Sequence, residues 1–265
     1  MFSTFMAHAW IVATMVAVVA GAVGFFVVAR RAAFAAHALP LGAFPGAAAA
    51  SLLGVSQLLG LVVFSALGVA AIARLQRGER REVASALWLA LSLAVGTLLL
   101  GFSGQYVQSI YGLLFGEVLG ISRGQLVGVA ALGVVALSVL VLFARPLLLE
   151  SLSEDLAAAA IGRSSRLEWV FLGILALSSA IAVPVVGALL VFSLMVGPAS
   201  AARAFTDRPW RALAVSVALA IGTVWAAIAL SYFSNWPVGF FVGVLSAACY
   251  VAGRLHGGGV VAQAA

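Results

Sequence analysis

The sequence contains no lysine and a single cysteine, and charged residues of both signs are scarce. Of its 265 residues, 65% are hydrophobic and 8% are charged, whereas soluble domains are about 45–50% apolar and about 25% charged. This composition excludes a water-soluble fold. The lone Cys249 excludes an internal disulfide and a cysteine cluster for metal. The net charge of +6 comes from arginine alone, and we interpret it as loop composition, with no nucleic-acid partner.

Catalytic motifs are also missing. The sequence has no nucleotide-binding P-loop and no paired-histidine zinc-protease motif, so ATP hydrolysis is expected from a separate subunit. One string, 101–104 (Gly-Phe-Ser-Gly), resembles the serine motif of rhomboid intramembrane proteases. That chemistry needs a histidine base in a later helix. The only later histidine is His256, in a glycine-rich tail, so the sequence disfavours a protease.

Long apolar runs predict an all-α fold, a polytopic transmembrane helix bundle of eight or nine spans in one domain, 1–265. Each span needs about 20 apolar residues. Arginine clusters beside the runs mark cytoplasmic loops by the positive-inside rule. They predict a multi-pass membrane protein whose N-terminus, with nine spans, lies outside. The predicted spans are near 9–29, 42–56, 57–73, 83–101, 126–144, 169–187, 188–202, 212–232 and 238–253.

Two of the apolar regions contain prolines that predict helix breaks. Pro40 and Pro45 lie at the second span, and Pro184 and Pro198 divide the run 169–202. Broken helices at membrane depth are tolerated where protein or a water-filled cavity satisfies the freed backbone groups. These regions are therefore candidates for a transport path, with simple structural kinks as the alternative.

Ionisable side chains are almost absent from the apolar runs. Among the acidic residues, Glu117 alone has a largely apolar context. Proton-coupled transporters carry ionisable relays inside the membrane, so energy is expected from outside the chain. Around Glu117, glycines recur every fourth residue from Gly112 to Gly124. This spacing predicts one helical face for close helix packing.

The longest polar connection between spans is 145–168. Ser153 is predicted to cap a short surface helix, with Glu154 and Asp155 in its first turn and its end near Gly162. A peripheral motor subunit would need such an element to hold the membrane subunit. The alternative is an ordinary solvated loop.

Four segments resemble one family, the membrane subunits of the zinc, manganese and iron ABC importers. Segment 30–46 resembles its paired arginines followed by Phe-x-Gly-Asp-Ala-Leu-Ser-His and Leu-Pro-Gly. Segment 114–122 is similar to Leu-Phe-Gly-x-Ile-Leu-x-Val-Ser. Segment 185–203 resembles Val-Gly-x-Leu-Leu-Val followed by Pro-Ala, and segment 231–239 resembles Tyr-x-x-Asp-x-Pro-x-Gly. The matches in the first segment are Phe34, Ala38, Leu39, Pro45 and Gly46.

This resemblance implies the membrane-spanning permease subunit of an ATP-binding cassette importer that moves a divalent transition metal ion (zinc, manganese or iron) across the bacterial plasma (inner) membrane. It implies a second permease subunit, cytoplasmic ATPase subunits and an extracytoplasmic metal-binding protein, all around a subunit embedded in membrane lipid. No permanently bound cofactor is expected, because the metal is cargo. Glu154, Asp155 and Gly162 fall in the loop that docks on the ATPase. The alternative is a secondary transporter or channel of unassigned cargo, which broken helices also permit.

The departures from the family pattern concern the metal path. The family's ion-contacting Asp and His correspond to His37 and Leu41, and its later Asp corresponds to Asn235. Leucine cannot ligate, and one histidine alone is a poor site for a dication, which takes four or more ligands. We therefore predict His37 as a path ligand, with Glu117 and Asn235 as further candidates. The alternative for His37 is a hydrogen bond to a carbonyl freed by a proline.

Overall fold

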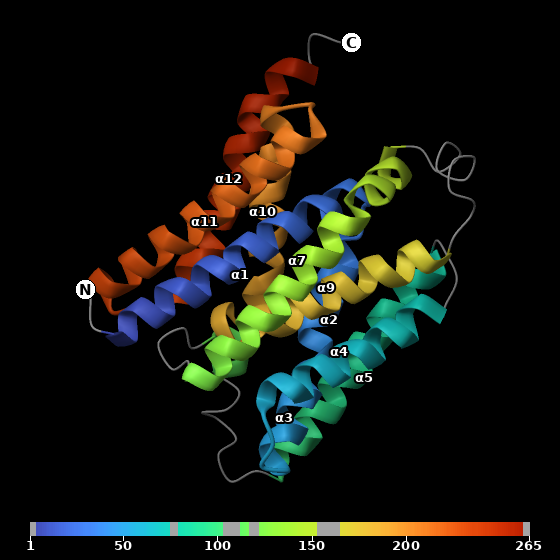
Figure 1. The fold of residues 1–265 in the computed structure, drawn as a ribbon, viewed down its shortest axis with the longest axis vertical. Coiled ribbons are helices and arrows are strands. Elements are labelled where there is room, and N and C mark those ends of the chain that lie inside the picture. Colours follow the sequence, from blue (N-terminus) through green and yellow to red (C-terminus); the bar gives the residue numbers. More distant parts are fainter. Residues whose placement is uncertain (1–3, 75–78, 103–111, 117–121, 153–164, 262–265) are drawn as a thin grey trace.

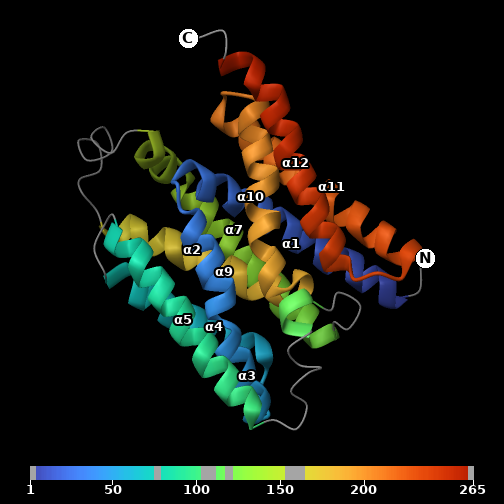
Figure 2. The same ribbon diagram turned by 180° about the vertical axis from the view of Figure 1, so that it is seen from behind.

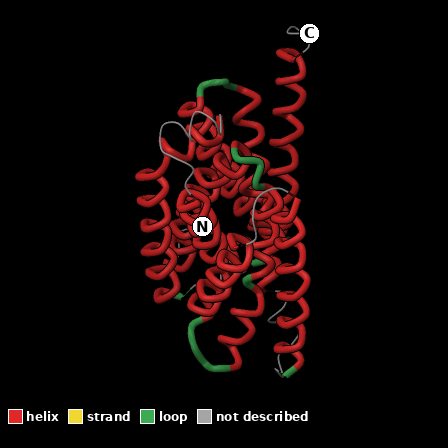
Figure 3. The backbone as a smooth tube through the Cα atoms, turned by 90° about the vertical axis from the view of Figure 1, so that its right-hand side faces the viewer, coloured by secondary structure: helices red, strands yellow, loops and turns green. Residues whose placement is uncertain are grey.

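The chain folds into a helical bundle, which a computed structural model describes over residues 4–74, 79–102, 112–116, 122–152 and 165–261. No strand occurs within these residues (Figure 3), and the predicted all-α class is confirmed. The principal helices are α1 (Thr4–Ala29), α2 (Ala33–Gly42), α3 (Phe44–Leu52), α4 (Gln57–Arg74), α5 (Glu79–Gly101), α7 (Arg123–Leu152), α9 (Ser165–Val186), α10 (Ala188–Phe205), α11 (Pro209–Ser234) and α12 (Val238–Val261).

The described helices include eight segments long and apolar enough to cross a membrane, and α5 contributes a shorter apolar stretch, Val83–Leu99. This agrees with the prediction of eight or nine spans. The second span, however, is Ala33–Leu52 and not 42–56. It consists of α2 followed by α3, interrupted only at Ala43. The predicted start was too late because residues before Pro40 continue the same alanine-rich helix.

Helix α7 corrects the predicted polar connection 145–168. The helix has 30 residues and includes both Arg145 and Glu150. At 1.5 Å per residue it is about 45 Å long, whereas the hydrocarbon core is about 30 Å thick. Its polar last turns therefore extend beyond the apolar layer as helix. Since α9 begins at Ser165, the connection itself is 153–164, which lies outside the described residues.

The run 169–202 divides where the predicted spans 169–187 and 188–202 meet, but neither of the two predicted prolines makes the break. Pro184 lies inside α9 and Pro198 lies inside α10. The two helices separate at Gly187, whose φ of 95° and ψ of 141° suit glycine alone. Prolines are accommodated within membrane helices because neighbouring groups satisfy the freed carbonyls. Glycine, and not proline, therefore ends this helix.

Helix α1 lies at the centre of the bundle (Figure 1). It packs against α7, α9, α10 and α11. Seen from behind, α10 and α12 lie together on one side of α1, while α3, α4 and α5 form a group on the other side (Figure 2). Helices α2 and α9 connect this second group to the centre, because each packs against α4 and α10.

Arginines mark one end of the bundle. Successive spans run in opposite directions, and the arginines stand at every second connection, so the helix ends that carry them lie at the same end of the bundle. Arg123, at the start of α7, is the exception among the described residues. The positive-inside rule assigns the arginine-rich end to the cytoplasm. The residues that mark it are Arg30, Arg31, Arg74, Arg80, Arg81, Arg145, Arg166, Arg203, Arg208, Arg211 and Arg254.

Candidate functional site

His37 lies on α2, where it faces α10. Its ring meets the ring of Phe192 edge-on, with centroids 5.2 Å apart and planes at 76°. Its Nδ1 atom is buried and has no hydrogen-bond partner. Buried polar atoms normally have a partner, and each exception calls for an explanation such as a ligand or ion. The alternative for His37, a hydrogen bond to a carbonyl freed by a proline, is not made by this nitrogen.

The surroundings of His37 are apolar. Leu39, Pro40 and Leu41 are all buried, so the position where the family carries its second ligand offers only a hydrocarbon side chain. Near the interruption at Ala43, the backbone N–H of that residue donates to the carbonyls of Leu39 and Pro40, at 3.0 and 3.3 Å. The carbonyls of Leu39 and Pro40 are therefore engaged within the backbone.

Helices α2 and α3 are held by close packing against α4 and α5. A Cβ atom added to Gly46 would lie within 3.0 Å of the Gly60 carbonyl group, and one added to Gly60 would meet Gly46 in the same way. One helical turn before Gly46, Gly42 accommodates the indole of Trp88, which also lies against Gly68. Glycine at these positions lets the helices approach closely. His37 is thus carried by a firmly placed helix.

Asn235 lies elsewhere, in the short connection between α11 and α12. It caps the C-terminus of α11 in the left-handed conformation, with φ 57° and ψ 23°, and its N–H donates to the Ser231 carbonyl at 2.9 Å. Asparagine is among the few non-glycine residues that adopt this conformation readily. The residue is exposed. Helix α2 packs chiefly against α4, α5, α9 and α10, so Asn235 and His37 belong to different parts of the fold.

The remaining predicted site residues, Glu117, Glu154, Asp155 and Gly162, lie outside the described residues. Within the described part of the chain, no three His, Cys, Asp or Glu side chains lie close enough together to hold one metal ion.

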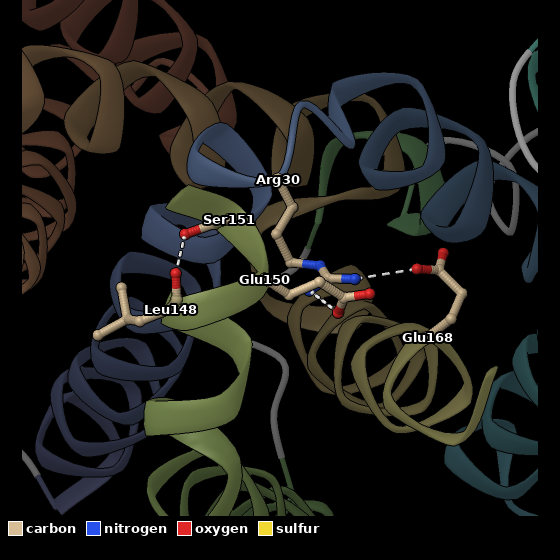
Figure 4. Close-up of polar contacts among 5 residues, drawn as sticks. All are labelled: Arg30, Leu148, Glu150, Ser151 and Glu168. Atoms are coloured by element: carbon tan, nitrogen blue, oxygen red, sulfur yellow. Dashed lines mark hydrogen bonds and ion pairs between the residues drawn. The ribbon is translucent and has the colours of Figure 1, made fainter. Parts of the chain in front are cut away.

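Sequence reasoning missed a cluster of charged side chains at the arginine-rich end, which we call the arginine cluster: Arg30, Glu150 and Glu168. Nη1 of Arg30 donates to Oε2 of Glu150 at 2.6 Å, and Nη2 donates to Oε2 of Glu168 at 3.0 Å (Figure 4). The guanidinium also lies 4.8 Å from the ring centre of Phe171. One arginine therefore joins the end of α1 to the last turn of α7 and the first turn of α9.

The backbone explains why Arg30 points inward while its neighbour does not. Arg31 has a φ of 54°. Its N–H donates to the Val28 carbonyl, and the N–H of Ala32 donates to the Val27 carbonyl. These two bonds form a Schellman motif that ends α1. The turn leaves Arg31 exposed, whereas the Arg30 side chain is only 9% exposed. The paired arginines signalled a loop in the sequence, but only one behaves as a loop residue.

At the opposite end, three of the family-like segments meet in a contact that we call the glycine junction: Gly116, Gly187 and Gly239. A Cβ added to Gly116 would lie 2.7 Å from the Gly187 nitrogen, and one added to Gly239 would lie 2.7 Å from the Phe115 carbonyl oxygen. The predicted helical face of four glycines is wrong here, because the turn 112–115 ends at Gly116, which has a φ of 77°. Gly116 instead allows the backbone to approach that of Gly187 closely.

Comparison with known proteins identifies the family. A model of the ABC 3 transport family matches residues 2–256. The manganese import system permease protein ScaB of Streptococcus parasanguinis is 27% identical over 249 residues, which cover 93% of this chain and 89% of ScaB. The high-affinity zinc uptake system membrane protein ZnuB of Haemophilus influenzae is 25% identical over 230 residues, covering 86% of this chain and 88% of ZnuB.

Solved structures share the fold. PsaBC from Streptococcus pneumoniae in complex with Fab matches with a TM-score of 0.84 and 24% identity, over 95% of this chain and 91% of the other. An inward-facing conformation of a putative metal-chelate type ABC transporter matches with a TM-score of 0.72 and 16% identity, over 92% and 84%. The resemblance carried by the four segments is confirmed. The chain is a multi-pass plasma-membrane protein that belongs to the ABC 3 transport family.

Proposed function

We propose that this chain is the permease subunit of an ATP-driven importer for a divalent transition metal ion, with manganese or zinc as the cargo. The observation that carries the proposal is the family match over nearly the whole chain. The relatives named for manganese and zinc also align over most of their own length. Because the chain belongs to an ABC family, nothing supports the alternative function, a secondary transporter or channel of unassigned cargo.

The same proposal assigns the energy source to other subunits. The sequence has no P-loop, so cytoplasmic ATPase subunits would hydrolyse ATP and bind the connection 153–164 through Glu154, Asp155 and Gly162. An extracytoplasmic metal-binding protein would deliver the ion, and a second permease subunit would complete the pathway. The neighbouring genes offer a first check, because an ATPase and a metal-binding lipoprotein are expected beside this one.

His37 is the proposed ligand within the path. A buried nitrogen without a partner is available to an ion, and a neutral ligand holds a dication more weakly than a carboxylate does. Transport sites have to release their cargo. Two copies of His37 in a dimer would offer two nitrogens to one ion. Glu117 and Asn235 remain the next candidates.

Uptake of radioactive metal tests this function. Cells that lack the protein should accumulate less manganese or zinc than wild-type cells when that metal is scarce, and a plasmid copy should restore uptake. Unchanged accumulation of manganese, zinc and iron, each measured under starvation for that metal, would refute the proposal.

A further inference from the structure

The arginine cluster joins three helices that are distant in sequence. Glu150 lies 120 residues from Arg30 along the chain, and Glu168 lies 138 residues from it. The two carboxylates take different nitrogens of the same guanidinium. A planar guanidinium can serve two acceptors in fixed directions, whereas an ammonium is a single point charge on a flexible stem. The arrangement therefore depends on arginine in particular.

The cluster is a costly way to hold three helices together. A partly desolvated ion pair loses part of its Coulomb energy to desolvation, and apolar side chains of similar size often stabilise a fold as well or better. Here the chain is rich in apolar residues, yet charged groups connect the helix ends. Such a cluster is better suited to linking helix ends, so that they move together, than to adding stability.

The location of the arginine cluster shows which helix ends it connects. Glu150 is in the last turn of α7 and Glu168 is in the first turn of α9, so the two carboxylates lie on either side of the connection between these helices. Arg30 follows the last residue of α1. A displacement of either carboxylate-bearing helix end would pull on Arg30 and hence on α1.

Helix α1 can pass such a displacement to the rest of the bundle. It packs against α7, α9, α10 and α11. Arg203 of α10 also reaches the end of α1, where Nη1 donates to the Val28 carbonyl at 3.4 Å. Four helix ends are thus tied together within one region at the arginine-rich end.

We propose that Arg30 is a positioning residue that couples movement of the α7 and α9 ends to the central helix α1, so that ATP hydrolysis drives transport. This inference rests on the proposed function. Arg30 acts through Glu150 and Glu168, which it keeps attached to the end of α1 so that the three helix ends move together.

The test compares two arginine-to-lysine substitutions one residue apart. Arg30→Lys keeps the charge but cannot hold both carboxylates in the same geometry. Arg31→Lys is the matched control, since Arg31 is exposed and makes no ion pair with any described residue. Manganese and zinc uptake is measured in cells, and ATP hydrolysis is measured on the complex purified with its ATPase in lipid nanodiscs. Both are normalised to the amount of assembled complex.

We expect Arg30→Lys to lower the ratio of metal uptake to ATP hydrolysis by about three- to thirtyfold, the size of effect that single residues in a coupling network produce. Arg31→Lys should leave this ratio unchanged. A third variant, Arg30→Gln with Glu150→Gln and Glu168→Gln, removes all three charges of the cluster together. This triple variant should assemble like the wild type, and its ratio of uptake to hydrolysis should fall as much as that of Arg30→Lys.

Two results would overturn the inference. In one, uptake and hydrolysis fall only in proportion to the loss of assembled complex, so that their ratio is unchanged. The cluster would then be an ordinary structural contact. In the other, the neutral triple variant couples normally. A wild-type protein that supports no uptake of manganese or zinc would instead remove the proposed function, and this inference with it.

Discussion

The two ends of the bundle are held together by different chemistry. At the arginine-rich end, side chains carry the connection, and Glu150 and Glu168 remain 20% and 22% exposed. At the other end, the glycine junction brings backbone atoms into direct contact and leaves no room for a Cβ. Ion pairs that water reaches can be exchanged and rearranged, whereas close backbone packing has few alternative arrangements. The comparison indicates an adjustable cytoplasmic end and a fixed extracytoplasmic end.

The largest effect is expected at the glycine junction. Gly187→Ala places a Cβ within 3.0 Å of the backbone of 114–116. Overpacking typically costs about 1–3 kcal/mol, and a left-handed backbone adds about 1–2 kcal/mol for a non-glycine residue. The variant should melt at a clearly lower temperature in detergent and yield less monodisperse protein.

Gly222→Ala is the control for this substitution. Gly222 lies within α11, and a Cβ added there would meet nothing within 4 Å. Replacing a helical glycine by alanine typically stabilises a helix by about 0.5–1 kcal/mol. If Gly187→Ala and Gly222→Ala melt at the same temperature, the glycine junction is not a fixed contact and the contrast between the two ends fails.

The second largest effect is expected at a residue that belongs to neither end, and it should appear in metal uptake more than in stability. His37→Ala removes the only described histidine placed within α2 and should abolish metal uptake. The melting temperature should fall only modestly, because Nδ1 forms no hydrogen bond that would be lost and the main loss is the ring contact with Phe192. His37→Asp, which introduces the family's residue, should retain uptake or change the preferred metal. Normal uptake by His37→Ala would show that the path lies elsewhere.

A smaller effect is expected from the arginine cluster, and it should depend on salt. Glu150→Gln removes one of two carboxylates from Arg30 and should cost about 1 kcal/mol of stability, the upper range for partly exposed ion pairs. Salt screens such pairs, so the loss measured by thermal melting should shrink at high ionic strength. The loss caused by Gly187→Ala should not. Equal salt dependence of both losses would contradict the distinction between the two ends.

Much of the fold followed from the sequence because lipid imposes strong rules. Long apolar runs must be helices, and arginines mark the cytoplasmic ends. The predicted helix boundaries were wrong where the rules for apolar runs and arginines give no information. Helix α7 continues through Arg145 and Glu150, because a polar turn beyond the apolar layer stays helical, and the second span begins at Ala33 and not at 42. The predicted spans 169–187 and 188–202 did place the division between α9 and α10, but Gly187 makes it and not Pro184. Helix ends are decided by local backbone conformation, which apolar runs do not reveal.

The candidate site was less predictable because it depends on pairs that are distant in sequence. No local pattern links Arg30 to Glu150 or Glu168, and the positive-inside rule treats both arginines of the pair alike. The glycine junction had a signal, since its three members lie in family-like segments. Their mutual contact, however, required the structure. His37 was identified from the family pattern, and its role in uptake stays a prediction.

The smallest effect is expected at Asn235, next to the glycine junction. Its left-handed conformation is tolerated by asparagine and preferred by glycine, so a capping role and a role in the metal path predict opposite results. Asn235→Gly should retain stability and uptake if the residue only ends α11. Asn235→Ala should cost about 1 kcal/mol, the penalty of a left-handed backbone for an ordinary residue, while uptake per folded molecule stays normal. Asn235→Asp restores the family's residue in the same backbone geometry. If Asn235→Gly loses uptake while Asn235→Asp keeps it, the side chain contacts the ion, and the extracytoplasmic end then carries chemistry as well as backbone packing.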